Sequence, residues 1–341
     1  MKKRNNCLKK LAFTLGLLFI FSGFNQLTAA SEPGEEFNPG DMILHHVVDN
    51  HTWHFFDGPY GTLYLPVILY SSDRGVEIFS SGNFYDDHHQ LVAYNGYEIE
   101  HSHIVPIDEG RHILDFSITK NVASMFISVI LMFLVFFSVR NGYSKNEGRA
   151  PKGIQSFFEP IILFIRDEVA KPNIGNGYEK YLPYLLTIFF FIWFNNLMGL
   201  LPGAANVTGN LAVTGTLAIF TFVITQFSGN RHYWRHIFNT PGVPWWLKIP
   251  LPIMPVVELI GVFTKPFSLT VRLFANITAG HIIILSLFSL IFIFQSIWVG
   301  PLSVAFAIFM FFLELFVALL QAFIFTILSA MYFGAAVEEH H

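Results

Sequence analysis

The sequence is poor in charged residues and almost free of cysteine. Lysine, arginine, aspartate and glutamate together make up 13% of its 341 residues, about half the share that is usual in soluble domains. The single cysteine, Cys7, has no partner for a disulfide bond and no cysteine cluster around it for a metal. The formal net charge of −4 is small and gives no sign of a nucleic-acid partner. The composition excludes a disulfide-stapled scaffold and indicates a chain solvated largely by lipid.

Two common catalytic motifs are also missing. The sequence has no Gly-rich phosphate loop that ends in Lys-Ser or Lys-Thr, and no His-Glu-x-x-His zinc pattern. The terminal Glu338–His341 segment lies beyond the last apolar run and is interpreted as a solvated tail. We therefore expect no cofactor, no catalytic metal and no catalytic site of its own.

The first thirty residues have the pattern of a secretory signal peptide. Basic residues between Lys2 and Lys10 precede an apolar run, Leu11–Phe21, and Thr28-Ala29-Ala30 follows it. The apolar run is shorter than the roughly 20 residues that span a bilayer. We expect residues 1–30 to be cleaved near Ala30, with retention as a membrane anchor as the alternative.

Residues 31–117 are polar and aromatic and contain no long apolar run. Short β-like runs, Thr62–Tyr70 and Gln90–Tyr94, are separated by turn signals at Ser71–Gly75 and Asn95-Gly96. We predict a small, partly β, extracytoplasmic domain.

Histidines are concentrated in this extension. His51-x-x-His54 would place two imidazoles on one face of a helix, where they would bind zinc or copper. Surface histidines without a ligand are the alternative, and the lack of an assisting cysteine favours it. The extension holds nine of the fourteen histidines: His45, His46, His51, His54, His88, His89, His101, His103 and His112.

The remaining residues, 118–341, predict an all-α polytopic membrane domain. A mixed segment near 154–170 has apolar residues at helical spacing between charges, which indicates a helix along the membrane surface. Five apolar segments are long enough to span a bilayer, and the last two are unusually long. These spans lie near 119–140, 181–201, 211–229, 251–293 and 302–334.

Basic residues gather in two of the connecting loops. The loops around 202–210 and 296–301 contain no lysine or arginine, whereas the other two do. The positive-inside rule then places the N-terminus outside and the C-terminus in the cytoplasm of a bacterial inner membrane. The basic residues are Arg140, Lys145, Arg149 and Lys152 after the first span, and Arg231, Arg235 and Lys248 after the third.

Arg272 is the residue that lipid should tolerate least. A charge at the centre of a spanning helix costs about 2.5–3.5 kcal/mol on insertion scales. No charged residue follows Arg272 before Glu314. Thr264, Ser268, Arg272 and Asn276 recur every fourth residue, so they form one polar stripe. The sequence leaves two readings open: a functional cation, or a structural arginine tied to backbone carbonyls or to Glu314.

Other polar residues extend this pattern along the last two segments. Glu258 falls near the stripe, whereas His281 is rotated by about 180° from Arg272 at 100° per residue. Glu314 and Gln321 are seven residues apart and share a face. A structural Glu314–His281 pair is one alternative, and the amides are ordinary helix-packing hydrogen bonders in another. Those amides belong to Gln321, Asn276, Asn195 and Asn196.

Three segments in order resemble subunit a of the F-type ATP synthases. The first is Asn-Leu-Met-Gly-Leu-Leu-Pro at 196–202, and the second is Pro-Phe-Ser-Leu-Thr-Val-Arg-Leu-Phe-Ala-Asn-Ile-Thr-Ala-Gly-His at 266–281. The third is Leu-Leu-Gln-Ala-Phe-Ile-Phe at 319–325. The resemblance covers roughly residues 120–340 and leaves out the polar extension.

The resemblance implies a non-catalytic stator subunit that couples proton translocation to rotary ATP synthesis. Its partners would be the c-subunit ring, against which the last two helices pack, the b-subunit stalk, the rest of the ATP synthase and the lipid bilayer. Arg272 matches the family's essential arginine, which favours ionised carboxylates on the ring and blocks leakage between two half-channels. For the extension, which the resemblance does not cover, we expect contacts with neighbouring stator chains.

Further positions carry over from the family one by one. His281 and Glu314 match two positions filled by a glutamate and a histidine in either order, and with Glu258 they would line the half-channel that opens outside. Asn276 and Gln321 match positions near the arginine. Expected secondary polar lining is provided by Asn195, Asn196, Lys265 and Ser268.

The sequence departs from the family pattern at one position, and two alternative functions stay open. Gly199 stands where some bacterial members carry an acid. A stand-alone ion transporter and a sodium-coupled version of the same subunit are alternatives, although no internal repeat of the kind common in transporters is visible.

Overall fold

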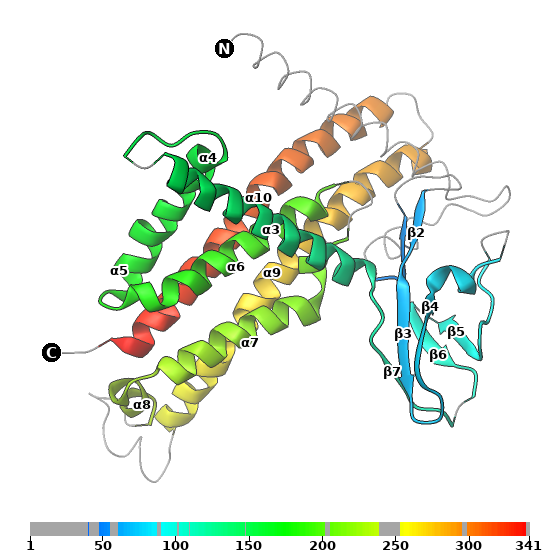
Figure 1. Cartoon of the computed structure of the whole chain (residues 1–341), viewed down its shortest axis with the longest axis horizontal. Coiled ribbons are helices and arrows are strands. Elements are labelled where there is room, and N and C mark those ends of the chain that lie inside the picture. The colour runs from blue at the N-terminus through cyan, green and yellow to red at the C-terminus, as the bar shows by residue number, and fades with distance from the viewer. Residues whose placement is uncertain are drawn as a thin grey trace. The chain divides into compact units, whose positions relative to one another are not determined.

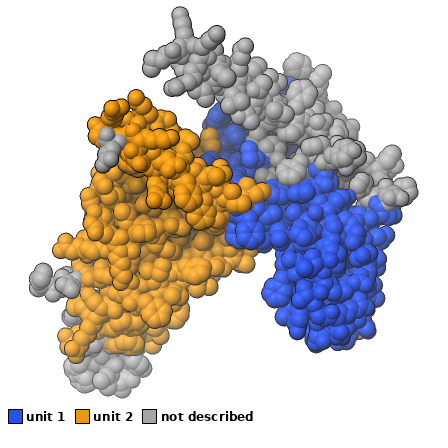
Figure 2. Space-filling view, viewed as in Figure 1, with its two compact units in different colours: residues 1–126, 197–207, 280–313 blue, residues 127–196, 208–279, 314–341 orange. Residues whose placement is uncertain are grey.

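The computed structural model describes residues 40, 48–54, 61–86, 90–100, 102–108, 110–146, 148–201, 205–238, 253–294 and 299–338. The predicted signal peptide lies outside these residues. Contacts divide the chain into two units (Figure 2). Unit 1 consists of residues 1–126, 197–207 and 280–313, and unit 2 of residues 127–196, 208–279 and 314–341.

The extension in unit 1 is built from short antiparallel strands (Figure 1). They pair as β1 with β2, as β4-β3-β7, and as β5 with β6. Asn95 and Gly96 join Tyr94 to Tyr97 with φ of 55° and 84°, the positive values that a two-residue hairpin turn requires. The elements are β1 (Thr52–His54), β2 (Thr62–Tyr64), β3 (Pro66–Ser71), β4 (Gly75–Ser80), η1 (Ser81–Phe84), β5 (Tyr97–Glu100), β6 (His103–Pro106) and β7 (Ile113–Asp115).

One face of the three-stranded sheet covers a small core. Alternation along β3 turns Val67 and Leu69 inward, and they pack with other fully or nearly buried residues, Phe84, Tyr97 and Ile104. The opposite face is exposed yet apolar, which is unusual for the solvated side of an antiparallel sheet. Its exposed side chains are Tyr70, Val76, Ile78, Leu114 and Phe116.

Nearly all of the remaining described chain is helical. Five helices are long and apolar enough to cross a membrane: α3, α6, α7, α9 and α10. This number agrees with the prediction of a five-span membrane protein. The helices are α3 (Lys120–Lys145), α4 (Ile154–Phe164), α5 (Lys171–Ile174), α6 (Tyr178–Gly199), α7 (Leu211–Ser228), α8 (Arg231–Phe238), α9 (Ile253–Phe294) and α10 (Val299–Val337); η2 (Ile165–Ala170) is π-helical and η3 (Val207–Gly209) is a 3-10 turn.

Helix α6 is the most enclosed of the five, with 56% of its apolar window buried. Aromatic rings connect it to its neighbours in unit 2. Phe190 contacts Phe136 of α3 at 4.9 Å between ring centres, and Tyr181 stacks on Phe333 of α10 at 5.0 Å. The high phenylalanine content therefore provides the packing between helices in this unit as well as lipid-facing surface.

Near its C-terminal end, α10 lies close to two segments of unit 2, at Asn173 and at Asn230. A Cβ placed on Gly334 would lie 1.9 Å from the carbonyl oxygen of Asn173, so only glycine fits there. Asn230, which precedes α8, donates from its backbone N–H to Ala336 O at 3.0 Å and from Nδ2 to Glu338 O at 2.8 Å. These contacts hold the end of α10 against α5 and against the start of α8, two segments that the sequence predicts on the cytoplasmic side.

The strand predictions need correction in two places. Thr62–Tyr70 is interrupted at Leu65 and forms β2 and the start of β3. Gln90–Tyr94 forms only isolated bridges, Tyr85 with Leu91 and Tyr94 with Tyr97. The expected helical face at His51-x-x-His54 is wrong as well, because Thr52–His54 is a strand, in which residues three apart point to opposite faces.

The last span, predicted near 302–334, begins earlier in the structure, ahead of Gly300-Pro301. Helix α10 begins at Val299 and includes both residues. Proline is tolerated in a first turn because the N–H that it lacks has no intrahelical acceptor there.

Candidate functional site

Helix α9 presents a polar stripe on its exposed side. The side chains of Thr264, Ser268, Arg272 and Asn276 are all exposed, one turn apart, in unit 2. The residues between them on this side are apolar and equally open: Phe267 is 69% exposed. The cation therefore projects from an apolar face of the helix and away from its packed face.

The packed face of α9 is lined by a regular apolar row. Leu269, Leu273 and Ile277 are 2%, 1% and 3% exposed, at the 3–4 spacing that puts them on one side of a helix. Among the described residues, Arg272 makes no hydrogen bond or ion pair. Asn276 and Gln321, which match family positions near the arginine, are therefore not hydrogen-bonded to it among these residues.

A buried polar layer lies where α6 meets α10. Asn196 Nδ2 donates to the carbonyl oxygen of Ala318 at 3.1 Å, and Thr208 Oγ1 donates to Asn196 Oδ1 at 2.6 Å. Ala318 lies one turn after Glu314 and nearly one turn before Gln321, and all three are buried on α10. Helix α6 therefore covers the face of α10 that carries the predicted carboxylate and amide.

Asn195, the neighbour of Asn196, has a more local role. It is 1% exposed, and its Nδ2 donates to Phe191 O, one turn back on α6, at 2.7 Å. Such a bond satisfies the amide within its own helix.

Lys265 lies over an aromatic ring of α10. Its Nζ is 5.2 Å from the centre of the Tyr332 ring, within cation–π distance. Glu258 lies one heptad earlier on α9 and is partly exposed, as is Lys265. Lys265 and Tyr332 also line a close-packed contact of α7, α9 and α10, whose residual cavity is about 10 Å³.

His281 belongs to unit 1. A Cβ on Gly199, at the end of α6, would lie 3.8 Å from His281 Nε2 and 3.8 Å from Ala205 O. The structure therefore brings His281 beside the position where the resemblance expects an acid in some members.

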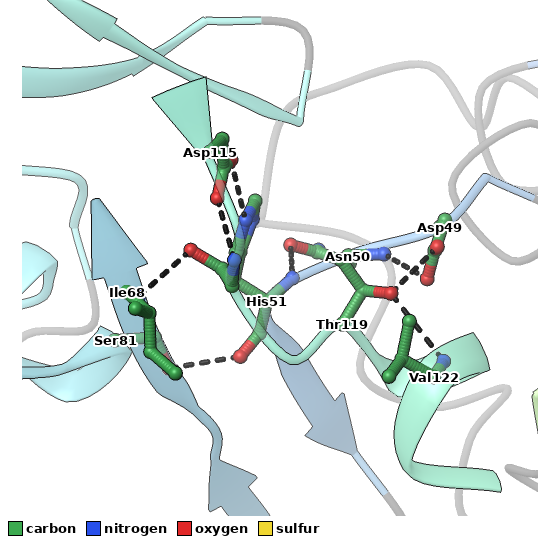
Figure 3. Close-up of polar contacts among 9 residues, drawn as sticks. Asp49, Asn50, His51, Ile68, Ser81, Asp115, Thr119 and Val122 are labelled. Atoms are coloured by element: carbon green, nitrogen blue, oxygen red, sulfur yellow. Dashed lines mark hydrogen bonds and ion pairs between the residues drawn. The ribbon is translucent and has the colours of Figure 1, made fainter. Parts of the chain in front are cut away.

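A second polar network joins the extension to the first spanning helix (Figure 3). Asp49 Oδ1 accepts the backbone N–H of Asn121 at 3.1 Å, and its Oδ2 accepts the hydroxyl of Thr119 at 2.8 Å. Thr119 Oγ1 in turn accepts the N–H of Val122 at 3.5 Å. A residue seventy positions away thus caps the N-terminus of α3, where N–H groups lack intrahelical acceptors.

His51 lies deeper in the same network. It is 2% exposed, and its Nε2 is 3.5 Å from Asp115 Oδ2, an ion-pair distance longer than a hydrogen bond. Burial alone would raise the pKa of Asp115, but His51 and the backbone N–H of Ser117, at 2.8 Å from Oδ1, outweigh it and leave the pKa below its ordinary value. Asp115 is therefore held as a carboxylate.

The histidine pair considered for a metal is not assembled. His51 faces Asp115, while His54 Nδ1 is hydrogen-bonded to Thr62 Oγ1 at 2.8 Å. No group of three or more histidine, cysteine or acidic side chains suited to a metal occurs among the residues that the structure describes. His45, His46, His88, His89 and His101 lie outside them.

Two contributors were missed by reasoning from sequence. Thr208, which bonds Asn196, follows a break in the apolar pattern, and nothing in its spacing connects it to Asn196. Tyr332 lies on the last span among apolar residues, where an aromatic side chain is most simply interpreted as part of the core. The contact of Thr208 with Asn196 and that of Tyr332 with Lys265 become visible only from the packing of α6, α9 and α10.

Comparison with known proteins adds the decisive observation. Residues 122–334 match the family described as ATP synthase A chain, which is more than half of the sequence. The chain belongs to this family. With its five apolar helices, it is a multi-pass membrane protein.

This chain is also similar to individual members of the family over nearly its whole length. The chain is 43% identical over 325 residues to ATP synthase subunit a 2 of Chlorobaculum tepidum, which covers 93% of this chain and 79% of that protein. It is 43% identical over 306 residues to ATP synthase subunit a of Chloroherpeton thalassium, at 87% and 77% coverage. It is 38% identical over 325 residues to ATP synthase subunit a of Anaeromyxobacter sp., which covers 92% of this chain and 74% of that protein.

The extension has a match of its own. Residues 42–125 correspond to a family described as a domain of unknown function (DUF8433). The match reaches into the first turns of α3, where Asp49 caps the helix. This boundary agrees with the structural coupling of the extension to the first span.

Proposed function

We propose that this A-chain family member is the non-catalytic stator subunit a of an F-type ATP synthase. Its Arg272 faces the carboxylates of a rotor ring of c subunits and couples proton translocation to ATP synthesis. The observation that carries the proposal is an arginine exposed on an apolar face in the middle of a spanning helix.

The physical argument is one of solvation. An uncompensated charge at mid-bilayer costs roughly 2.5–3.5 kcal/mol or more, and Arg272 has apolar exposed neighbours such as Phe267 and Val271. Lipid cannot serve as the solvent of such a face. A protein surface with carboxylates at the same depth satisfies it, and a passing ring of c subunits provides one carboxylate after another.

The guanidinium group then performs two tasks at once. It favours the ionised form of each carboxylate that approaches, which promotes proton release to one side. It also repels a mobile proton, so that two aqueous half-channels stay separated. Arginine is suited to both tasks because its side chain remains protonated in proteins.

We assign His281, Glu314 and Glu258 to the half-channel open to the outside. An imidazole and a carboxylate suit a proton relay near neutral pH. The buried layer of Asn196 with Glu314 and Gln321 supports a polar path along α10, and Asn195, Lys265, Ser268 and Asn276 complete its lining.

The basic loops and the signal-like N-terminus support an orientation with the extension outside and the C-terminus in the cytoplasm of a bacterial inner membrane. We propose residues 1–30 as a cleaved signal peptide, 31–117 as an extracytoplasmic domain and 118–341 as the membrane domain. The expected partners are the c ring, the b-subunit stalk and the rest of the ATP synthase.

The extracytoplasmic domain is proposed to contact neighbouring stator chains. Support comes from the exposed apolar face of its sheet, where Tyr70 pairs in register with Val76 and Leu114. Deleting residues 31–115 should lower the yield of assembled complex. An unchanged yield would remove this role and leave the membrane assignment intact.

Cross-linking tests the orientation of the Arg272 face. In a Cys7→Ser background, a cysteine at Ala275, exposed one turn from Arg272, should cross-link to the ring-forming chain in the assembled complex. A cysteine at Phe227, which is 89% exposed on α7, is the matched control and should not. Equal labelling at both sites, or isolation of the chain without ring-forming subunits, favours the stand-alone transporter instead.

A further inference from the structure

A cavity lies between the end of α3 and the start of α4. Its volume is about 490 Å³, and its lining includes Tyr143, Ser144 and Arg149. All of it belongs to unit 2. The proposed proton path makes no use of this cavity, which lies where the first span ends in a basic loop.

The floor of the cavity is an ordered polar group. Gln155 is 5% exposed, and its Oε1 accepts from Asn146 Nδ2 at 3.0 Å. Its Nε2 donates to Glu159 Oε2 at 3.1 Å, which engages that carboxylate. A Cβ on Gly142 would lie 3.0 Å from Gln155 Oε1, so the absence of a side chain at Gly142 leaves room for the Gln155 side chain. The floor is held in position by α3 and α4 together.

The loop beside the cavity is rich in exposed cations, namely Arg140, Lys145, Arg149 and Lys152. Of these, Arg149 lines the cavity itself, and the one carboxylate in the lining, Glu159, is already hydrogen-bonded by Gln155. Helix α4 begins at the cavity without a side-chain cap among the described residues. Uncapped N–H groups of a first helical turn bind phosphate oxygens well.

The surroundings favour a lipid as the source of that phosphate. Ile154 and Phe157, which flank Gln155 on α4, are 48% and 59% exposed, and Phe137 on α3 is 56% exposed. Apolar side chains near a cavity that is lined by an arginine provide room for acyl chains beside a headgroup. A free phosphate ion would make no use of them.

We propose that this cavity binds the phosphate headgroup of an anionic phospholipid, with Arg149 as its main cationic contact. The acyl chains lie along Ile154, Phe157 and Phe137. The inference depends on the proposed orientation only for the leaflet, which is the cytoplasmic one. The bound lipid joins α3 to α4 at the membrane surface.

Lipid retention in the intact complex tests the proposal. The assembled ATP synthase is stripped in detergent and titrated with phosphatidylglycerol, with phosphatidylcholine or with inorganic phosphate, and bound lipid is counted by native mass spectrometry. Arg149→Ala should weaken phosphatidylglycerol binding at this site about tenfold or more, the scale of one lost charge-assisted hydrogen bond. Arg149→Lys should retain much of it, because the charge remains.

Arg231→Ala is the matched control, since Arg231 is an exposed arginine at the start of α8 in the other basic loop. It should leave this binding unchanged. Equal retention in wild type, Arg149→Ala and Arg231→Ala would overturn the proposal, as would equal binding of phosphatidylcholine. Saturation by inorganic phosphate alone would show an anion site that does not select lipid, and would overturn it too. The readout needs no proton flow, so its failure is distinct from failure of the Arg272 assignment.

Discussion

At the scale of single residues, Arg272 could be singled out from sequence because the evidence is local. A cation in a long apolar run, with polar residues every fourth position, is visible without any structure. That the side chain is exposed and turned away from the chain's own core comes from packing, because Leu269 and Leu273 fill the opposite face. The amide of Asn196 shows the converse, since its partners Thr208 and Ala318 come from distant segments.

A pH effect is expected at Asp115. Its pKa is lowered in the folded protein, so its ionised form contributes stability above the unfolded pKa of about 3.9, and this contribution is lost as pH falls through the lower folded pKa. Asp115→Asn should therefore destabilise the extension at pH 7 and make little difference once the pH is below the lowered folded pKa. Fluorine NMR of Trp53, buried in β1 and labelled as 5-fluorotryptophan, reports unfolding. A stability difference that does not change with pH would contradict this account.

At the scale of elements, spans were easier to predict than their ends. Apolar length alone indicates five crossings, whereas α10 begins at Val299, just before the Gly300-Pro301 pair and ahead of the start predicted near residue 302. The short strands were harder, because Gln90–Tyr94 has strand-like composition but pairs only at isolated bridges. Strand formation depends on a partner strand, which periodicity cannot supply.

Gly334→Ala should disrupt the end of α10. The added Cβ would lie 1.9 Å from Asn173 O, so the helix or the α5 segment must move, and overpacking of this kind costs about 1–3 kcal/mol or more. Thermal stability of the purified complex is the measurement. Gly300→Ala, in the first turn of the same helix, meets nothing within 4 Å and is the control. Equal stability of the two variants would show that the close approach is absent.

Asp49→Ala should loosen the start of α3. The variant removes the acceptor for Asn121 N–H and Thr119 Oγ1, a loss of about 0.5–2 kcal/mol for a helix cap. Hydrogen exchange at residues 119–123 should accelerate, while exchange in α6 stays unchanged. Unaltered protection at 119–123 would mean that the extension does not cap the helix.

At the scale of the whole molecule, composition and apolar length predicted a mostly helical membrane protein with five spans, and the structure has five helices long and apolar enough to cross a membrane. The arrangement of α6 against α10 needed the structure, since side-chain contacts between distant helices carry no mark in a single sequence. Under the proposed function, selectivity for the coupling ion belongs to this scale as well, because it would reside mainly in the c ring.

We expect protons as the coupling ion, because His281 and Glu314 suit a proton relay. In sodium-free vesicles carrying the complex, ATP-driven pumping should continue and should collapse when an uncoupler is added. Pumping that requires sodium and resists the uncoupler would favour the sodium-coupled alternative.

The charge at position 272 is tested most directly by ATP synthesis in proteoliposomes under an imposed membrane potential. Arg272→Ala complexes that contain the full set of subunits should make no ATP above the uncoupled background, while a matched Thr264→Ala complex, changed about two turns away on the same exposed stripe, retains most of its synthesis. Sustained synthesis by fully assembled Arg272→Ala complexes would contradict the role given to this arginine.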